Sequence, residues 1–498
     1  MAFYGKGEAR LNREQRLYSV IYDYFFSRIF LGFYQEGDVL PSIGEVREMF
    51  GVSTRTIRKA YHMLEEEGYL SISRGRNAVV ARGAPENQCR EVCVAYFTAR
   101  RDSILDLSRM SKQILPDIFL RGLLLMDGEG LDDLARLVEK IRVQNLQTQL
   151  QCFCRILAPL DNSLLSSFFW EISVFSRMTY LRGLFADEAE NELDSEILRR
   201  KFMRMIAVRR AGDSEQLRTL FDRFFEDCDA HVRAHFGELA SRYAGASEPE
   251  QVPFTWRVYK GRPQQGFFIA MKLIRKIYAG DYRIGEFLPS AADLAEEYGV
   301  SVITIRRTLV LLGQLGLTET INGRGTRVIP QEERVARQGL QAPAVRKNLK
   351  IFLQTVQLLA LTGEPVMLAA FPHFKPDGVR RAAEMFRSET AYNIIPLICM
   401  ELVADSDASP SLRELYGQMS DLFSWGVILR FLERENVVSD ERREPIGEMC
   451  AGLETGDAGR FANAFRGLMF RILEGVGDRL REWGIRWERE PVVPEVPG

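Results

Sequence analysis

A stretch of fourteen residues that occurs twice decides the fold of this chain. Residues 29–42 read IFLGFYQEGDVLPS and residues 277–290 read IYAGDYRIGEFLPS, so seven positions repeat at an offset of 248. The same offset continues without a gap through Gly51-Val52-Ser53, Thr56-Ile57-Arg58, Leu64, Gly68 and Gly75-Arg76. An ungapped match of this length indicates an internal duplication.

The first copy predicts a helix-turn-helix. Apolar residues at helical spacing over 12–31 predict a first helix. Ser42 and Glu45 have the spacing of a capping box, which predicts a second helix that ends at Phe50. Gly51 permits the sharp turn that leads into a third helix.

The sequence of this copy predicts a third helix with a polar outer face. Ser53 is its expected cap and Gly68 its expected end, just after Glu67. Helical spacing turns three residues toward the core, namely Ile57, Tyr61 and Leu64. It leaves five others outside, namely Thr54, Arg55, Arg58, Lys59 and His62. Short runs at 69–73 and 78–81 then predict a hairpin with a basic tip.

The repeat extends more faintly into the rest of the chain. Asn162-Ser163-Leu164-Leu165 resembles Ser409-Pro410-Ser411-Leu412, and Ala211-Gly212-Asp213 resembles Thr455-Gly456-Asp457. We therefore expect a mainly α fold with tandem winged helix-turn-helix modules, each followed by an all-helical bundle. The expected domains are winged helix 10–82, helical domain 90–243, winged helix 257–330 and helical domain 345–490, with linkers near 83–90, 244–256 and 330–345.

The pattern I-x-x-G-x-Y-x-x-G-x-x-LPS, followed by G-V-S-x-x-T-I-R and a G-R hairpin tip, resembles the GntR family of bacterial regulators. The resemblance implies a module that binds double-stranded DNA through its third helix and its hairpin, the wing. The residues that it places at the DNA are Ser53, Thr54, Arg55, Thr56, Arg58, Arg74, Gly75 and Arg76 in the first copy. Those of the second copy are Ser301, Val302, Ile303, Thr304, Arg306, Asn322, Gly323 and Arg324.

Both copies depart from the family pattern. The family usually has an arginine two residues after the LPS serine, where this chain has Gly44 and Ala292. Each copy thereby loses a side chain suited to pairing with guanine. In the first wing Asn77-Ala78 replaces the usual Gly-Thr, which the second wing keeps as Gly325-Thr326.

The third helix of the second copy presents Val302 and Ile303 where polar residues are common in the family. We therefore expect the two modules to read different half-sites. Related regulators pair two identical subunits on a palindromic operator, so a duplicated chain is expected to act as a single-chain pseudo-dimer on an imperfect inverted repeat. A monomeric pseudo-dimer and a homodimer are both open. The alternative is an assembly protein whose winged helices contact other proteins.

The charge distribution favours the DNA interpretation. The 498 residues carry a net charge of −2, but residues 10–82 hold 11 Lys/Arg against 9 Asp/Glu. Residues 257–329 hold 11 Lys/Arg against 6 Asp/Glu. Two positive segments in an acidic body are typical of phosphate-binding modules on a carrier.

The helical intervals resemble the effector domain of the FadR-like branch of the family, an all-helical ligand-binding bundle. Phe153-Cys154-Arg155-Ile156-Leu157-Ala158 carries this resemblance. It implies a small organic effector, and an acidic effector would need a basic pocket. Arg155 and Arg177 are candidates for that pocket, with the alternative that both are surface residues.

Many FadR-like domains bind a metal with one Asp and three His. The aligned positions here are Leu150, Cys154, Phe202 and Phe224, and in the second copy Leu397, Glu401, Ile446 and Leu468. Apolar side chains offer no lone pair to a cation, so we expect no metal and no other cofactor. His231 and His235 stand four residues apart, and a solvated helix face is favoured over a ligand pair. His373 is expected in a loop or at a helix cap.

Other function classes are disfavoured. We see no apolar run of membrane-spanning length and no secretory leader, so we expect a cytoplasmic protein with no membrane partner. The seven cysteines lack disulfide or zinc spacing, which is typical of reduced thiols. An aminotransferase-like domain would need a large α/β unit, and no phosphate-binding glycine loop, nucleophile elbow or HExxH motif occurs. We therefore expect no enzyme.

Overall fold

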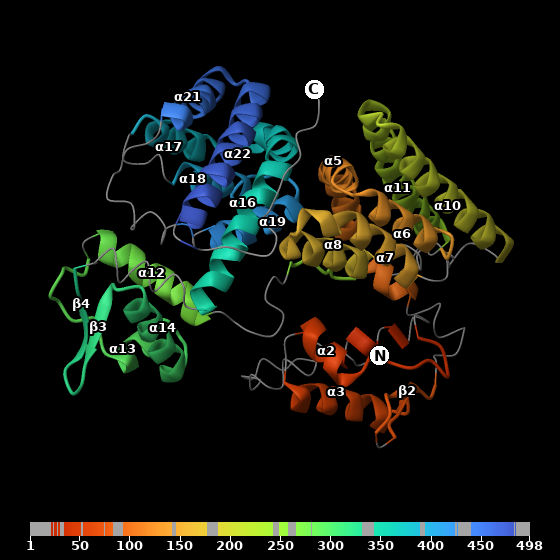
Figure 1. The fold of residues 1–498 in the computed structure, drawn as a ribbon, viewed down its shortest axis with the longest axis horizontal. Helices are drawn as coiled ribbons and strands as arrows, with labels where there is room; N and C mark the ends of the chain where they lie inside the picture. The colour runs from red at the N-terminus through yellow and green to blue at the C-terminus, as the bar shows by residue number, and fades with distance from the viewer. Residues whose placement is uncertain are drawn as a thin grey trace.

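The computed structural model describes residues 21–22, 24–26, 28–29, 34–50, 53–73, 75–82, 93–141, 146–176, 188–242, 249–256, 265–279, 281–330, 343–388, 394–423, 426, 440–482 and 484. Within these residues helices dominate, and strands form two small antiparallel sheets. The fold is therefore mainly α, as the sequence predicts. Figure 1 shows two helical bundles with one winged helix below each bundle in this view.

The first winged helix has the predicted order of elements. They are α2 (Ile43–Phe50), α3 (Thr54–Glu66), β1 (Leu70–Ser71) and β2 (Val79–Val80). The described residues of the preceding helix include Ile21, Phe25 and Ile29, which are fully buried. They belong to one apolar cluster with Ile57 and Leu64 of α3. Apolar spacing along each helix thus produces a small core of its own.

The second winged helix repeats this order with longer strands. Its elements are α12 (Gln265–Ala279), α13 (Ala291–Glu297), α14 (Val302–Gln314), β3 (Thr318–Ile321) and β4 (Gly325–Val328). Its buried residues Leu273, Ile305 and Leu312 belong to the same apolar cluster as the helical bundles. In the first winged helix the corresponding cluster is separate.

Each winged helix is followed by a bundle, and the two bundles have corresponding helices. The first contains α5 (Arg101–Leu124), α6 (Gly128–Val138), α7 (Leu146–Leu157), η1 (Ala158–Leu160), α8 (Ser163–Ser176), α10 (Glu188–Ala211) and α11 (Ser214–Arg242). The second contains α16 (Pro343–Ala370), η2 (Phe371–His373), α17 (Pro376–Phe386), α18 (Ile395–Ala404), α19 (Pro410–Phe423), α21 (Asp440–Thr455) and α22 (Ala458–Glu482).

Burial follows the 248-residue offset into the bundles. Leu134 and Val138 of α6 are buried, and so are Ala382 and Phe386, the residues 248 positions later in α17. In the same way α5 precedes α6 as α16 precedes α17. The duplication therefore includes the helical parts, because the same pattern of buried positions builds the same helix packing twice.

Helix α16 lies between the two bundles. It packs against α22 and α19 of its own bundle and also against α5 and α8 of the first. The segment Asn348–His373 is long and apolar enough to cross a membrane by length and composition, but 83% of its apolar window is buried within the protein. The expectation that no apolar run reaches this length was wrong. The apolar run of α16 is this long because protein covers the helix on several sides.

The described part of the second predicted linker, residues 249–256, is packed against the bundles. The Val252 amide donates to the carbonyl of Ala99 at 2.7 Å. Trp256 is buried, its ring centroid lies 5.1 Å from that of Phe168, and its amide donates to Glu414 of α19 at 2.9 Å. This segment therefore ties α8 to α19, which a free linker would not do.

Candidate nucleic-acid interface

Helix α3 begins with a well-formed cap. The Ser53 hydroxyl accepts from the Thr56 amide at 3.2 Å, and the backbone of Ser53 is extended, as an N-cap requires. Gly68 adopts a positive φ of 81° directly after the helix, which stops it as predicted. The capped end leaves backbone N–H groups and a partial positive charge at the start of α3, which suits a phosphate.

Burial divides α3 as the sequence predicts. Ile57, Tyr61 and Leu64 are buried. The Tyr61 hydroxyl donates to the carbonyl of Pro41 at 2.9 Å, which holds α3 against the turn before α2. Six side chains on the other side are exposed, namely Ser53, Thr54, Arg55, Arg58, Lys59 and His62, while Thr56 is half-buried.

Helix α14 has the same cap and a different outer surface. The Ser301 hydroxyl accepts from the Thr304 amide at 3.2 Å, which matches the distance in the first module. Arg306 is exposed and Thr304 is half-buried. Val302 and Ile303 are 37% and 62% exposed, so the first turn of this helix presents hydrocarbon to solvent.

Helices α2 and α13 each begin with a capping box. Ser42 and Glu45 make reciprocal contacts, as the capping box predicts, and Ser290 and Asp293 do so in the second module. The hydrogen bond from the Ser42 hydroxyl and amide holds the pKa of Glu45 below its usual range. The residues where the family usually has arginine, Gly44 and Ala292, are exposed in their helices. The missing guanidinium would therefore have pointed outward.

The two wings differ in length. In the described part of the first wing, the ladder consists of Leu70 and Ser71 paired with Val80 and Val79, so its strands are shorter than predicted. In the second, the pairing extends from Thr318 to Ile321 and closes around a turn of Asn322, Gly323 and Arg324. Gly325 has a φ of 116°, a conformation that strongly favours glycine.

The first wing has Asn77 at the position of Gly325, which gives a physical reason for its shorter ladder. Gly75 has a φ of 77° and, like Arg76, is exposed, whereas Arg74 lies outside the described residues. In the second wing Asn322, Gly323 and Arg324 are all exposed. Each wing thus has an arginine on its exposed tip.

The bundles meet through a polar contact that sequence reasoning missed. Asp106 of α5 accepts hydrogen bonds from the Ser409 hydroxyl and the Ser411 amide, both at 2.8 Å, at the start of α19. Gln354 of α16 stands 248 residues after Asp106. Its side chain accepts from the Ser163 hydroxyl at 2.9 Å and donates to the Asp161 carbonyl at 2.9 Å, at the start of α8.

This pair of contacts has approximate twofold symmetry. Helix α5 contacts the start of α19, while its counterpart α16 contacts the start of α8, the counterpart of α19. Such reciprocity is what an isologous dimer interface requires. Only the repeated Asn162-Ser163 and Ser409-Pro410 motifs indicated these sites in the sequence, and they gave no hint of their partners.

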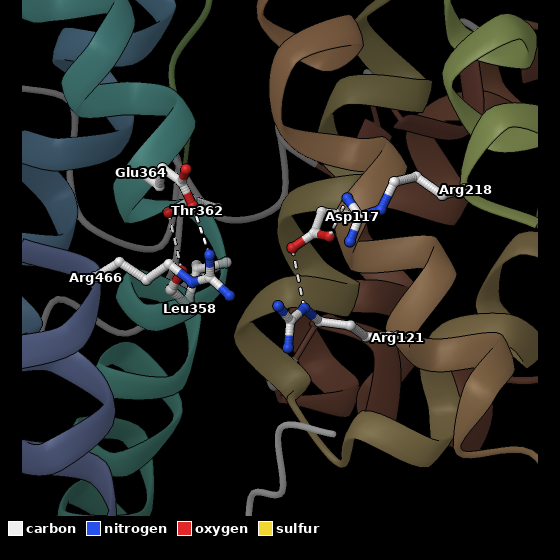
Figure 2. Close-up of polar contacts among 7 residues, drawn as sticks. All are labelled: Asp117, Arg121, Arg218, Leu358, Thr362, Glu364 and Arg466. Carbon is white, nitrogen blue, oxygen red and sulfur yellow. Dashed lines mark hydrogen bonds and ion pairs between the residues drawn. The ribbon is translucent and has the colours of Figure 1, made fainter. Parts of the chain in front are cut away.

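Ion pairs also join helices within each bundle. Asp117 of α5 pairs with Arg218 of α11 at 3.1 Å and with Arg121 at 3.0 Å, and Glu364 of α16 pairs with Arg466 of α22 at 2.7 Å (Figure 2). The guanidinium groups of Arg121 and Arg466 lie 5.8 and 5.7 Å from the ring centroid of Phe470. Arg121 is only 2% exposed, so this residue of the first bundle is buried against the second.

The first winged helix touches the first bundle. Arg28 is buried, and its guanidinium lies 3.3 Å from the ring centroid of Tyr24 and 6.0 Å from that of Trp170 in α8. Burial raises the pKa of Tyr24, and the nearby carboxylate of Glu171 adds to this rise. These residues were not singled out in the sequence because their contacts join distant segments.

The positions aligned with metal ligands contain aromatic core. Leu150, Phe202 and Phe224 are buried, and the ring centroids of Phe202 and Phe224 lie 6.0 Å apart. Phe153 contacts both rings. In the second bundle Leu397, Ile446 and Leu468 are buried, whereas Glu401 is exposed.

The described histidines of the bundles lie at the surface or near it. On α11 His231 is exposed and His235 is half-buried, with their Nδ1 atoms 2.6 and 2.7 Å from the backbone oxygens of Asp227 and His231. His373 ends the short helix η2. No group of three or more His, Cys, Asp or Glu suited to a metal ion occurs in the part of the chain that the structure describes.

An open cavity of about 520 Å³ lies on the first bundle between α6 and α7. Its lining includes Arg136, Lys140 and Arg155, with Asp133 and Cys154. Asp133 pairs with both Arg155 and Arg136, and the hydrogen bond from Arg155 holds its pKa below the usual range. Burial raises the pKa of the Cys154 thiol. Arg155 lines this cavity and is also exposed at the surface, so its role in binding an effector stays a prediction, and Arg177 lies outside the described residues.

The geometry defines a protein with two winged helix-turn-helix domains joined by paired helical bundles. Residues 17–80 and 267–328 match the family described as "Bacterial regulatory proteins, gntR family". Both winged helices therefore match the GntR family, and two separate matches agree with the duplication inferred from the sequence.

The chain is similar to three regulators over short segments. It is 30% identical to the uncharacterised HTH-type transcriptional regulator YieP of Escherichia coli over 80 residues, 16% of this chain and 35% of that protein. It is 41% identical to an uncharacterised HTH-type regulator of Streptomyces coelicolor over 63 residues (13% and 23%). It is 41% identical to the HTH-type transcriptional regulator TreR of Bacillus subtilis over 49 residues (10% and 21%).

These matches span only 21% to 35% of the length of the relatives. The relatives are transcriptional regulators and not enzymes, as the sequence predicts for this chain. Among solved structures, a GntR protein of Streptococcus agalactiae is 15% identical, with 42% of this chain and 99% of that chain covered and a TM-score of 0.20. Escherichia coli McbR/YncC is 14% identical (44% and 99%), with a TM-score of 0.23.

Proposed function

We propose that this protein is a sequence-specific, DNA-binding transcription regulator that acts as a single-chain pseudo-dimer on an imperfect inverted repeat. The residues at the DNA in the first half are Ser53, Thr54, Arg55, Thr56, Arg58, Arg74, Gly75 and Arg76. Those in the second half are Ser301, Val302, Ile303, Thr304, Arg306, Asn322, Gly323 and Arg324. The domain limits are 10–82, 90–243, 257–330 and 345–490, and the expected location is the cytoplasm.

The reciprocal contact between the bundles is the observation that carries this proposal. Asp106 and Gln354 occupy equivalent places and each binds the start of a helix in the other bundle. Both winged helices also lie on the same side of the paired bundles in Figure 1. Two DNA-binding modules held by a twofold interface are suited to two inverted half-sites.

Each module has the parts that such binding needs. The capped start of α3 or α14 supplies N–H groups for phosphate, and exposed arginines follow one turn later at Arg58 and Arg306. The wing arginines Arg76 and Arg324 are exposed as well. A helix of this kind fits the major groove, where base edges carry the sequence information.

Selection from random duplex DNA with the full chain, followed by mass measurement of the complex, tests the proposal. We expect one chain on one site that contains two related but unequal half-sites in inverted orientation. A chain carrying both Arg58→Ala and Arg306→Ala is the control and should bind the selected site much more weakly. Recovery of single half-sites, or of strict palindromes bound by two chains, would overturn it.

The second candidate is an assembly protein, which the exposed Val302 and Ile303 of α14 favour. It predicts no salt-dependent affinity for DNA. Titration of fluorescent genomic fragments at two salt concentrations separates the two functions, because phosphate-driven binding weakens steeply as salt rises.

A small organic effector is the family expectation, and the cavity beside Arg155 is where we place it. Arg136, Lys140 and Arg155 line the cavity against one carboxylate, Asp133, so an acidic metabolite fits its charge. Thermal-shift screening with carboxylic acids tests this, since a ligand that binds the folded state raises its stability. Arg155→Ala should abolish the shift, whereas Arg380→Ala, on the second bundle, should leave it unchanged.

We also infer that neither bundle holds a structural or regulatory metal. The aligned positions supply at most one donor each, Cys154 or Glu401, whereas zinc needs three or four. Elemental analysis of untagged protein should find no stoichiometric zinc, nickel or manganese. One equivalent of metal per bundle, lost on chelation together with DNA binding, would contradict this inference.

A further inference from the structure

The second winged helix has replaced polar residues with apolar ones along one exposed helix. At the 248-residue offset, Thr54, Arg55 and His62 of α3 become Val302, Ile303 and Val310 of α14. The three apolar residues are 37%, 62% and 59% exposed. Among the described large apolar residues of the first winged helix, Val39 alone is comparably exposed.

These side chains are outside the core of the module. Ile305, Leu309 and Leu312 form the buried side of α14, as Ile57, Tyr61 and Leu64 do in α3. Helical spacing puts Ile303, Arg306 and Val310 on one exposed face, three and four residues apart. Hydrocarbon and guanidinium groups therefore share the surface that begins at the Ser301 cap.

We propose that Val302 and Ile303 read thymine bases in the second half-site by packing against their C5 methyl groups. This inference rests on the proposed function, and it names the base that the second module prefers. In the major groove a thymine presents one carbonyl acceptor and one methyl group, and apolar side chains recognise the methyl. Burying the methyl removes apolar surface of both partners from water.

The charge around these residues favours DNA over a protein as the occupant. Arg306, Arg307 and the wing residue Arg324 are exposed on the same module. Residues 257–329 carry 11 Lys/Arg against 6 Asp/Glu. DNA is a polyanion with methyl groups in its major groove, so it matches both the apolar side chains and the positive charge of this module. In this arrangement Arg306 contacts a phosphate.

Deoxyuridine scanning tests the inference, because deoxyuridine lacks only the methyl group of thymidine. Each thymidine of the selected operator is replaced in turn, and affinity is measured with the full chain. We expect a loss of about fourfold for each methyl that packs against Val302 or Ile303, confined to the second half-site. The equivalent replacements opposite Thr54 and Arg55 should have smaller effects.

Two variants make the assignment specific. Ile303→Ala should remove the sensitivity to deoxyuridine at one position, which a double-mutant cycle detects as coupling. In a chain with Val302→Thr and Ile303→Arg, the first turn of α14 carries the same residues as the first turn of α3. The sequence that its second module prefers should then shift toward that of the first half-site. Both residues are exposed, so folding should be unaffected, and circular dichroism checks this.

The outcomes separate failure of the inference from failure of the proposed function. Binding that depends on Arg306 but is insensitive to every deoxyuridine in the second half-site would overturn the inference alone. Absence of salt-dependent binding to any duplex would overturn the proposed function. Unchanged specificity of the Val302→Thr, Ile303→Arg chain would also overturn the inference.

Discussion

The first and second winged helices share a scaffold and differ on their exposed faces. The cap distance from Ser53 to Thr56 equals that from Ser301 to Thr304, 3.2 Å in both modules. One turn of α3 exposes Thr54 and Arg55, whereas the same turn of α14 exposes Val302 and Ile303. Caps and buried positions have stayed alike because packing demands them, and the outer face has diverged because only binding constrains it.

The modules also differ in how they are held. The core of the second belongs to the same apolar cluster as the bundles, whereas the core of the first is a separate cluster. The first instead touches α8 through Arg28, whose guanidinium lies 6.0 Å from the ring centroid of Trp170. We therefore expect the second winged helix to be held more rigidly against the bundles than the first.

The largest effect that we predict distinguishes the two bundles. A Cβ atom added to Gly122 of α5 would lie 2.3 Å from the backbone oxygen of Ile156, which cannot yield as a side chain would. The equivalent residue of α16, Ala370, already has a Cβ and is fully buried. Gly122→Ala should cost about 3 kcal/mol of the free energy of unfolding by overpacking.

The matched change Ala370→Gly should cost only about 1 kcal/mol, which reflects the lower helix propensity of glycine. Urea unfolding of both variants measures the difference. Equal costs would show that the bundles do not pack in the corresponding way.

The next effect concerns the reciprocal contact. Asp106 accepts two hydrogen bonds at the start of α19 and is buried, so Asp106→Ala should destabilise the chain by about 2–3 kcal/mol. Gln354→Ala, its neutral counterpart, should cost about 1–2 kcal/mol. Chemical denaturation monitors both, with Asp106→Asn as a control that keeps an acceptor. If neither alanine variant changes stability, the two bundles do not depend on this contact.

The third effect separates the two recognition helices. Arg58→Ala and Arg306→Ala should each weaken DNA binding by about 1–3 kcal/mol. Loss of Arg58 should relax the preference at one base pair, whereas loss of Arg306 should lower affinity on all sequences alike. Affinity measured on the operator and on single-base variants distinguishes the two patterns. Unchanged binding by both variants would mean that another face of the helix meets DNA.

The smallest effect lies in the second module alone. Lys276 pairs with Glu297 at 2.8 Å, and this hydrogen bond holds the pKa of Glu297 below its usual range. The pair therefore contributes stability above the ordinary pKa of a glutamate, and the contribution disappears as pH falls through the lowered pKa. Both side chains are more than one third exposed, so Glu297→Gln should cost only about 0.3 kcal/mol near neutral pH.

Thermal unfolding near neutral pH and at about pH 3 measures this difference, which should vanish in acid. Glu296→Gln, one residue earlier on the exposed side of α13, is the control. A cost of Glu297→Gln that persists in acid would mean that the ion pair is not its cause.

Much of each winged helix could be predicted from the sequence because it depends on neighbours along the chain. The caps at Ser53 and Ser301, the buried spacing of Ile57 and Leu64, and the stop at Gly68 all involve residues within a few positions of each other. The strands of the first wing were predicted too long, since Asn77 stands where the longer wing has Gly325. Which of the exposed residues contact DNA stays a prediction.

The sequence by itself determined the duplication, the mainly helical class and the local structure of both winged helices. The reason is that matches at a constant offset and apolar residues at helical spacing can be seen in the chain without its tertiary structure. Only the tertiary structure decided that Asp106 and Gln354 face the opposite bundle, that the rings of Phe202 and Phe224 pack 6.0 Å apart, and that α16 is covered by protein. Those contacts join residues as far apart as the 305 positions between Asp106 and Ser411. Partners at such separations are chosen by how whole helices pack, and no local pattern specifies them.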